Sequence, residues 1–272
     1  MKIIQLTNMT PCQSMGYVIK AKSGEVIVID GGARGNEEEL QRVIKKTGSH
    51  VDLWLITHPH HDHHDSVINL LSNVDCGITY DVICSSGLTD SWADKKKQGD
   101  QLKNWNKFVR EKVKDRFIEL KKGQVFNIGT VTVDVLSDAN PEIDRNITNN
   151  QSIVFRITED GFSFLMLGDL GIEGEELITN VDLKSDAVQM AHHGQQGVSE
   201  DFYKKIRPEF AFWPTPKWLW DNTKYLGAGS PGEGSFKTPE NAEWMRKLGA
   251  KNIFSFENTV VFDTETKKTE DF

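Results

Sequence analysis

The stretch that decides the fold is residues 53–66, LWLITHPHHDHHDS, where an apolar run leads into a tract of histidines and aspartates. Five histidines and two aspartates stand within the eight residues from 58 to 65. Apolar runs of this length, bounded by polar residues, are typical of buried strands. A buried strand that ends in side chains with affinity for metal ions predicts a metal site at the edge of a sheet.

The other histidines of the chain support this interpretation. The chain has eight histidines, and only His50 lies outside two clusters, at 58–64 and 192–193. Histidines that fill a core or decorate a surface would be scattered instead. The clustering therefore indicates that the histidines share one chemical task.

The composition argues against several broad classes of protein. With 272 residues, 38% of them hydrophobic, the chain can bury one large core. Its net charge of −8 repels phosphate backbones, so broad nucleic-acid binding is not expected. No apolar run approaches the ~20 residues that span a bilayer, so no membrane segment is expected. A basic-then-apolar secretory signal is missing and the three cysteines form no CxxC pair, so we expect a cytoplasmic protein with reduced cysteines.

Strand-like and helix-like segments alternate along the whole chain without a linker. Strands are predicted at 2–6, 16–21, 25–30, 51–57, 124–129, 130–137, 152–158, 162–169, 187–191, 209–213, 252–256 and 259–263. Helices are predicted at 37–48, 65–74, 88–116, 172–180 and 238–249, with 88–116 expected to be largely solvated. This order predicts one layered α/β domain over residues 1–272.

Four of the predicted strands end in a carboxylate or an imidazole. VIVID ends at Asp30, LWLIT runs into His58, FSFLMLG runs into Asp169, and AVQMA runs into His192 and His193. Sites in sheet proteins gather at strand ends, where rigid elements hold side chains that loops expose. These strand ends therefore predict a common metal centre.

The spacing inside the first histidine cluster predicts two metal ions. His58 and His60 occupy alternate positions of an extended segment, so their imidazoles point the same way. Asp62 and His63 follow in a turn and can face a second point, and a carboxylate such as Asp169 can bridge two metals ~3.5–4 Å apart. Histidine and aspartate ligands without cysteine suit Zn²⁺, with Mn²⁺ or Fe as alternatives.

These residues resemble a known family. The segment THPHHDH (57–63) is similar to the HxHxDH motif of the metallo-β-lactamase fold superfamily. Asp30 in VIDGG, GDL at 168–170 and AHHG at 191–194 resemble its other site motifs, in the expected order. The resemblance implies a four-layer αββα sandwich and a site that holds two zinc ions.

A branch of the superfamily is also indicated. Its β-lactamases and glyoxalase-type hydrolases carry a further histidine ligand between the first motif and the bridging aspartate, whereas this chain has no histidine between His64 and His192. In its place, NNQSIVFRI (149–157) resembles the ComEC-type competence domain and the bacterial phosphorylcholine esterases, as does the ending TPENAEWMRKLGAKNIF (238–254). The membrane helices of the competence proteins are not present in this sequence.

The resemblance implies roles for individual residues. It assigns His58 and His60 to one metal ion, Asp62 and His63 to the other, and Asp169 to both. His193 is favoured to complete the metal shell, which leaves His192 to face the substrate, although the reverse assignment stays open. His192 and Asp62 are the candidate catalytic residues.

Several further residues are expected around this centre. Asp30 is expected to hold a ligand imidazole from behind, and Asn150 to support the site; a turn that satisfies its own backbone is the alternative for each. For Trp213, Trp218 and Trp220 a packed core edge with a loop anchor is expected, and a candidate substrate pocket walled by these rings is the alternative. Outside the motif, His61 and His64 are expected on the loop surface, with Asp65 or Ser66 capping the helix that follows.

The resemblance implies a hydrolase in which two metal ions activate water. Members of the indicated branch act on phosphodiesters or are thought to be nucleases, and the net charge of −8 favours a small phosphoester over long duplex DNA. A hydrolase of carboxylic esters, thioesters or lactams is the first alternative. A metal-stabilised binding domain without turnover is the second.

Overall fold

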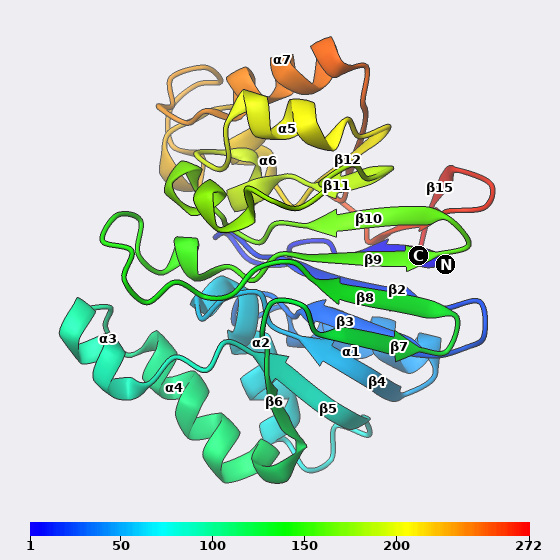
Figure 1. Cartoon of the computed structure of the whole chain (residues 1–272). Coiled ribbons are helices and arrows are strands. Elements are labelled where there is room, and N and C mark those ends of the chain that lie inside the picture. The colour runs from blue at the N-terminus through cyan, green and yellow to red at the C-terminus, as the bar shows by residue number, and fades with distance from the viewer.

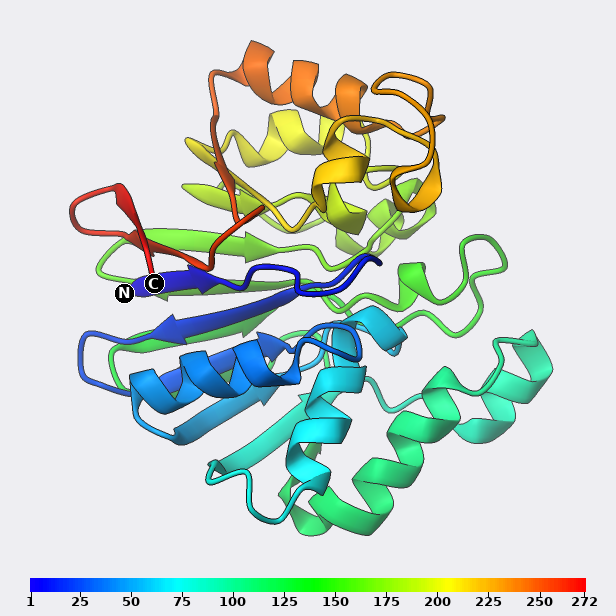
Figure 2. The same cartoon turned by 180° about the vertical axis from the view of Figure 1, so that it is seen from behind.

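The structure, a computed structural model, describes all residues from Met1 to Phe272. Two β-sheets face each other, and helices cover the outer side of each (Figure 1). Seen from behind, α1 (Glu37–Thr47) and α2 (His61–Ser72) lie across the outer face of one sheet (Figure 2). The predicted four-layer α/β sandwich is confirmed.

The first sheet has eight strands in the order β15-β14-β1-β2-β3-β4-β5-β6. Its strands β3 to β6 run parallel to one another, whereas its other neighbours are antiparallel. The bounds are Lys2–Gln5 (β1), Gly16–Lys20 (β2), Val26–Asp30 (β3), His50–Leu55 (β4), Thr79–Ser85 (β5), Phe117–Glu119 (β6), Val260–Asp263 (β14) and Lys268–Asp271 (β15).

The second sheet has seven strands in the order β13-β12-β11-β10-β9-β8-β7. Here β10 to β13 run parallel and β7 to β10 antiparallel. The bounds are Val125–Ile128 (β7), Val131–Val135 (β8), Phe155–Glu159 (β9), Phe162–Met166 (β10), Ala187–Gln189 (β11), Phe210–Trp213 (β12) and Lys251–Phe254 (β13). The arrowheads of β3 and β10 point to the same end of the molecule, so the two sheets present their carboxyl ends side by side (Figure 1).

The remaining helices are short. The α-helices are Asp90–Lys96 (α3), Gln101–Phe108 (α4), Glu200–Ile206 (α5), Lys217–Trp220 (α6) and Thr238–Leu248 (α7). A π-helical turn follows α4 at Val109–Val113, and short 3-10 helices lie at Lys114–Arg116, Asn149–Gln151, Ile172–Ile178, Ala191–Gly194 and Tyr225–Gly227. None of the helices combines the length and apolar character that a bilayer crossing requires.

Three hydrophobic layers hold the sandwich together. The inner layer joins the facing sides of both sheets and contains the aromatic rings of Tyr17, Phe164 and Phe212, with the Phe164 and Phe212 centroids 4.8 Å apart. A second layer joins the first sheet to α1, α2 and α4, and a third joins the second sheet to α5 and α7. Successive residues of a strand point alternately to the inner layer and to a helix-covered layer. Each sheet is therefore apolar on both faces, and this fixes the fold.

Two expectations about helices are corrected. Helix α2 begins at His61, not at Asp65 or Ser66, with His60 extended at the N-cap. The histidine tract thus forms the first turn of the helix, where a carboxylate such as Asp62 interacts favourably with the helix dipole.

The tract 88–116 is helical, but it is more than a solvated face. Its aromatic residues Trp92, Trp105 and Phe108 are buried against the first sheet. Because lysines stand between these apolar positions in the sequence, the apolar face of the tract was not recognised from the sequence alone. Strand β5 was not predicted for the same reason. Its sequence TYDVICS alternates exposed and half-buried positions before its buried end.

Truncation of the inner layer tests this packing. We expect Phe164→Ala to lower the free energy of unfolding by about 3–5 kcal/mol, because the fully buried ring leaves a cavity between the sheets. Val74→Ala, at a side chain that is 89% exposed, should change it by less than about 0.5 kcal/mol. Denaturant unfolding measures both, and equal effects would contradict the proposed layering.

Candidate metal centre

The candidate centre lies where the carboxyl ends of the two sheets meet. Asp30 ends β3, His58 follows β4, Asp169 follows β10, and His192 and His193 follow β11. All five predicted strand-end residues are thus delivered to one edge of the sandwich. They approach it from both sheets.

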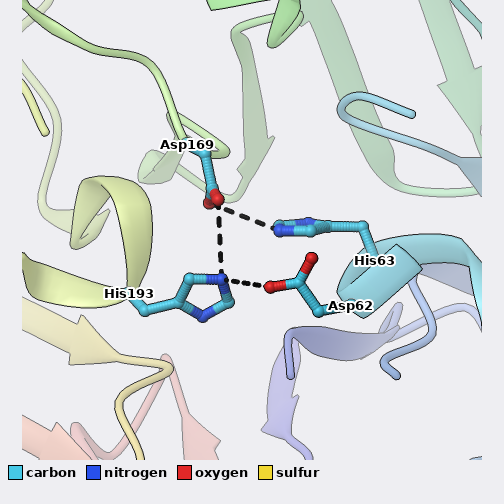
Figure 3. Close-up of side chains that lie close together, drawn as sticks. All are labelled: Asp62, His63, Asp169 and His193. Atoms are coloured by element: carbon cyan, nitrogen blue, oxygen red, sulfur yellow. Dashed lines mark ion pairs between the residues drawn. The ribbon is translucent and has the colours of Figure 1, made fainter. Parts of the chain in front are cut away.

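One group of side chains comprises Asp62, His63, Asp169 and His193, which point toward one another (Figure 3). His193 Nε2 lies 3.2 Å from Asp62 Oδ2 and 3.5 Å from Asp169 Oδ2. His63 Nε2 lies 3.4 Å from Asp169 Oδ1. Two imidazoles and two carboxylates therefore converge from three segments of the chain: the start of α2, the loop after β10 and the segment after β11.

The second group consists of His58, His60 and again Asp169. His58 Nε2 lies 3.0 Å from His60 Nδ1 and 3.7 Å from Asp169 Oδ2. Asp169 is therefore the one residue common to both groups, with each of its oxygens near a different imidazole.

The buried polar atoms of the first group fit a bound cation. His63 Nε2, His193 Nε2 and Asp169 Oδ1 are all buried without a hydrogen-bond partner. Each such atom costs about 1–3 kcal/mol when it stays unsatisfied. Nitrogen and oxygen donors in this arrangement are those that zinc and related divalent cations accept. The two groups together therefore fit a pair of metal ions that share Asp169.

Hydrogen bonds from behind orient the imidazoles. His63 Nδ1 lies 2.7 Å from Asp30 Oδ2, and His193 Nδ1 lies 2.9 Å from the carbonyl oxygen of Pro214. Asp30 also accepts 2.8 Å hydrogen bonds from the backbone N–H and the hydroxyl of Thr57. These contacts turn Nε2 of both rings toward the centre, as ligand imidazoles require.

The AHHG segment has an unusual backbone. His192 and His193 both have left-handed φ angles, 52° and 53°, and Gly194 follows at 77°. A Cβ at Gly194 would lie 2.5 Å from the Trp213 ring, so only glycine fits there. Left-handed backbone at two consecutive residues that are not glycine costs about 1–3 kcal/mol for each and is typical of functional sites.

The two histidines of this segment occupy different environments. His193 is fully buried among the ligands, whereas the side chain of His192 is 19% exposed. His192 Nδ1 lies 3.0 Å from the carbonyl oxygen of Gln196, and its Nε2 lies 3.2 Å from Asn149 Nδ2. Because His192 Nε2 is also 3.9 Å from Asp169 Oδ2, this residue lies at the entrance to the centre.

The NNQS segment supports the loop that carries Asp169. Asn150 Oδ1 accepts from the backbone N–H of Gly171 at 2.8 Å, and Ser152 Oγ accepts from that of Asp169 at 2.9 Å. Asn150 Nδ2 donates to the carbonyl oxygen of Arg145 at 2.9 Å. Asn150 therefore fastens the Asp169 loop without touching the imidazoles.

The charges of the centre depend strongly on one another. Burial alone would lower the pKa of His193, but the carboxylates of Asp169 and Asp62 outweigh it and raise that pKa to about 9. Burial alone would raise the pKa of Asp62, but the imidazoles of His63 and His193 hold it well below its usual range. Burial lowers the pKa of His60 to about 4, which favours the neutral form that binds metals.

The structure places two of the surrounding residues in the core: for Trp213 this excludes the substrate-pocket alternative, and for His64 it corrects the expected surface position. Trp213 is fully buried beneath Gly194, so it packs under the site and offers no wall to a substrate. His64 is also fully buried, since helix α2 turns it inward to stack on Trp105 with the ring centroids 5.5 Å apart. His61 is exposed, as expected.

The other two tryptophans of the candidate pocket are half-buried. Trp220 packs edge-on against Trp213 and against Phe254. Trp218 donates from Nε1 to the carbonyl oxygen of Pro11 at 3.0 Å and lines a cavity of about 220 Å³. Trp213 and Trp220 line neither this cavity nor the one beside His192.

A larger cavity, of about 400 Å³, adjoins His192 and was not predicted from the sequence. Its wall includes Glu173, Lys237 and Trp244; of these, Trp244 lies in the TPENAEWMRKLGAKNIF segment, and the other two lie in none of the recognised motifs. Glu173 is distant in the sequence from Lys237 and Trp244, which are the N-cap and a member of helix α7. No sequence pattern could have grouped them.

Known proteins share the sequence pattern and the fold. The profile of the Metallo-beta-lactamase superfamily matches residues 9–211. Over 96 residues the chain is 35% identical to ComE operon protein 3 of Bacillus subtilis (strain 168), a match that spans 34% of this chain and only 12% of that longer protein.

Solved structures resemble the whole chain. The metallo-beta-lactamase fold protein YhfI from Bacillus subtilis superposes with a TM-score of 0.59 at 11% identity, over 96% of this chain and 99% of that one. Zn(2+)-bound PqqB from Methylobacterium extorquens superposes with a TM-score of 0.54 at 8% identity, over 97% of this chain and 100% of that one. At such low identities these similarities establish the fold alone.

Removing the charge behind His63 tests the site. We expect Asp30→Asn to weaken metal binding about 10–100-fold, because the imidazole loses the carboxylate that orients it. Asp186→Asn is a matched control, since Asp186 also accepts 2.8 Å hydrogen bonds from a backbone N–H and a hydroxyl, both of Ser163, at the start of β11. Metal titration monitored by calorimetry compares the two, and equal affinities would contradict the role of Asp30.

The metal-free protein should lose stability as the pH rises. Folding raises the pKa of His193 from 6.5 to about 9, so its stabilising contribution is complete below pH 6.5 and is lost as the pH approaches 9. Denaturant unfolding of chelator-treated protein between these values measures the slope. His193→Gln should reduce that slope, and an unchanged slope would rule out His193 as its source.

Proposed function

The chain belongs to the metallo-beta-lactamase superfamily, and on that premise we propose that it is a hydrolase with two zinc ions that acts on a small phosphodiester. The observation that carries the proposal is the position of Asp169, whose carboxylate takes part in both groups of metal-binding side chains. A carboxylate shared in this way is what a pair of metal ions requires of a bridging ligand.

The residues divide the chemical work between them. Metal ions held by the two groups would supply a water of lowered pKa and would neutralise charge that develops on the substrate. Asp30 and the Pro214 carbonyl keep the His63 and His193 imidazoles directed at the centre. His192 lies at the entrance and can hold a proton for the departing group or donate to a phosphoryl oxygen.

Two features support a phosphodiester. The NNQS segment occupies the region where other branches carry a further histidine, and this segment resembles the branch that acts on phosphodiesters. The net charge of −8 makes a small substrate more suitable than a long polyanion.

The first test combines metal content and activity. Wild-type protein should contain about two zinc ions per chain and hydrolyse bis-p-nitrophenyl phosphate. Asp169→Asn should lose zinc and lower kcat/KM by roughly 10³-fold or more, because the bridging carboxylate is gone. Elemental analysis and initial rates measure both quantities.

A matched control lies within the same histidine tract. His61 is exposed and belongs to neither group, so His61→Ala should keep both its zinc and its activity. Hydrolysis of an acyl ester or of nitrocefin in preference to the phosphodiester would replace the proposed substrate class. Two zinc ions with tight phosphodiester binding but no turnover would indicate a binding domain.

A further inference from the structure

We propose that the cavity beside His192 receives the leaving group of the phosphoester and that Glu173 selects a leaving group without negative charge. This inference rests on the proposed function and deepens it. It assigns a substrate class to a cavity that lies outside the two groups of metal-binding side chains. Of the site residues expected from the sequence, only His192 lines this cavity.

The position of the cavity identifies which part of a substrate it can hold. His192 lines its wall, while His192 Nε2 is 3.9 Å from Asp169 Oδ2 at the metal centre. A substrate whose phosphorus sits at the centre therefore extends past His192 into a space of about 400 Å³. The group on that side is the one to which His192 can deliver a proton, which makes it the leaving group.

The charges on the cavity wall do not balance. Glu173 supplies its one carboxylate and Lys237 its one ammonium group. The Lys237 ammonium is 2.8 Å from Glu240, which lies outside the cavity wall and neutralises it. Glu173 has no cation within ion-pair distance, and its Oε2 accepts only from Asn150 Nδ2, at 3.1 Å. One negative charge in the cavity is therefore uncompensated.

The carboxylate of Glu173 is also held close to the loop that carries Asp169. A Cβ at Gly171 would lie 3.2 Å from Glu173 Oε2, so the carboxylate rests against the backbone two residues after Asp169. Glu173 is exposed to solvent, and this contact holds its charge beside the part of the cavity wall that Gly171 forms. The field that it creates acts on any group that leaves past His192.

The rest of the wall suits a neutral or cationic group. The half-buried indole of Trp244 can contact an apolar or a positively charged group with its ring face, and Ile172 and Val198 add apolar surface. Amide side chains such as Asn146 add hydrogen-bonding capacity without charge. A leaving group with its own phosphate or carboxylate would instead face Glu173, which disfavours the internal bonds of a polynucleotide.

A matched set of substrates tests the inference. Methyl phosphodiesters of phenols that carry a para 2-aminoethyl, propyl or 2-carboxyethyl group differ mainly in charge, and in each the phenol is a better leaving group than methoxide. Wild-type, zinc-loaded protein should release the aminoethyl phenol with a kcat/KM at least about tenfold above that for the carboxyethyl phenol. Glu173→Gln should reduce this ratio, and Glu173→Lys should reverse the preference. Comparison between variants cancels the intrinsic reactivity of the esters.

The control variant is Glu176→Gln, which removes a charge from the same 3-10 helix at an exposed residue outside the cavity wall and should leave the ratio unchanged. Equal ratios in wild type and Glu173→Lys would overturn the inference, and hydrolysis of the propylphenyl ester would still uphold the proposed function. If none of the esters is hydrolysed, the proposed function fails. Calorimetric binding of the same three diesters then decides the charge preference, and absence of that preference overturns the inference.

Discussion

The carboxylate of Asp169 is the constraint on which the rest of this structure depends. It lies within 4 Å of ring nitrogens from four histidines, His58, His63, His192 and His193, which come from both halves of the sandwich. A buried carboxylate is costly unless positive charge or hydrogen bonds surround it. The two sheets must therefore bring their carboxyl ends together with imidazoles already aimed inward, and the serine of the NNQS segment must hold the backbone of Asp169 in place.

The backbone around this carboxylate is strained, and the packing beneath it holds the strained residues in place. Asp30 and both histidines of the AHHG segment adopt left-handed φ angles that such residues rarely have. The Trp54 indole donates to the carbonyl oxygen of Asp30 at 2.9 Å, and the Tyr203 hydroxyl accepts from the N–H of Ala191 at 3.0 Å. Because these anchors are fully buried, the strained geometry is held by the hydrophobic layers. The site is thus inseparable from the sandwich below it.

The sequence predicted much of this because the metal-binding side chains follow recognisable strands. Apolar runs ending at Asp30, His58, Asp169 and the HHG pair predicted a common centre, and these residues do meet at one edge. Prediction from the sequence failed where a polar tract also follows the helical period, and where the contacting residue is remote in the chain. His64 was expected at the surface because it sits in a polar tract, yet the helical period turns it onto Trp105. For Trp213 the sequence left a substrate pocket open as an alternative, which the contact with Gly194 excludes.

The sequence by itself determined the candidate metal-binding side chains, their order, and the strands that present them. It could do so because ligand spacing and strand periodicity are local properties of the chain. Only the tertiary structure decided how those ligands divide into two groups around Asp169, which histidine of the HHG pair is buried, and that Glu173, Lys237 and Trp244 line one cavity. Those outcomes depend on contacts between segments far apart in the chain, where no local pattern records which side chains become neighbours or which charges remain unpaired.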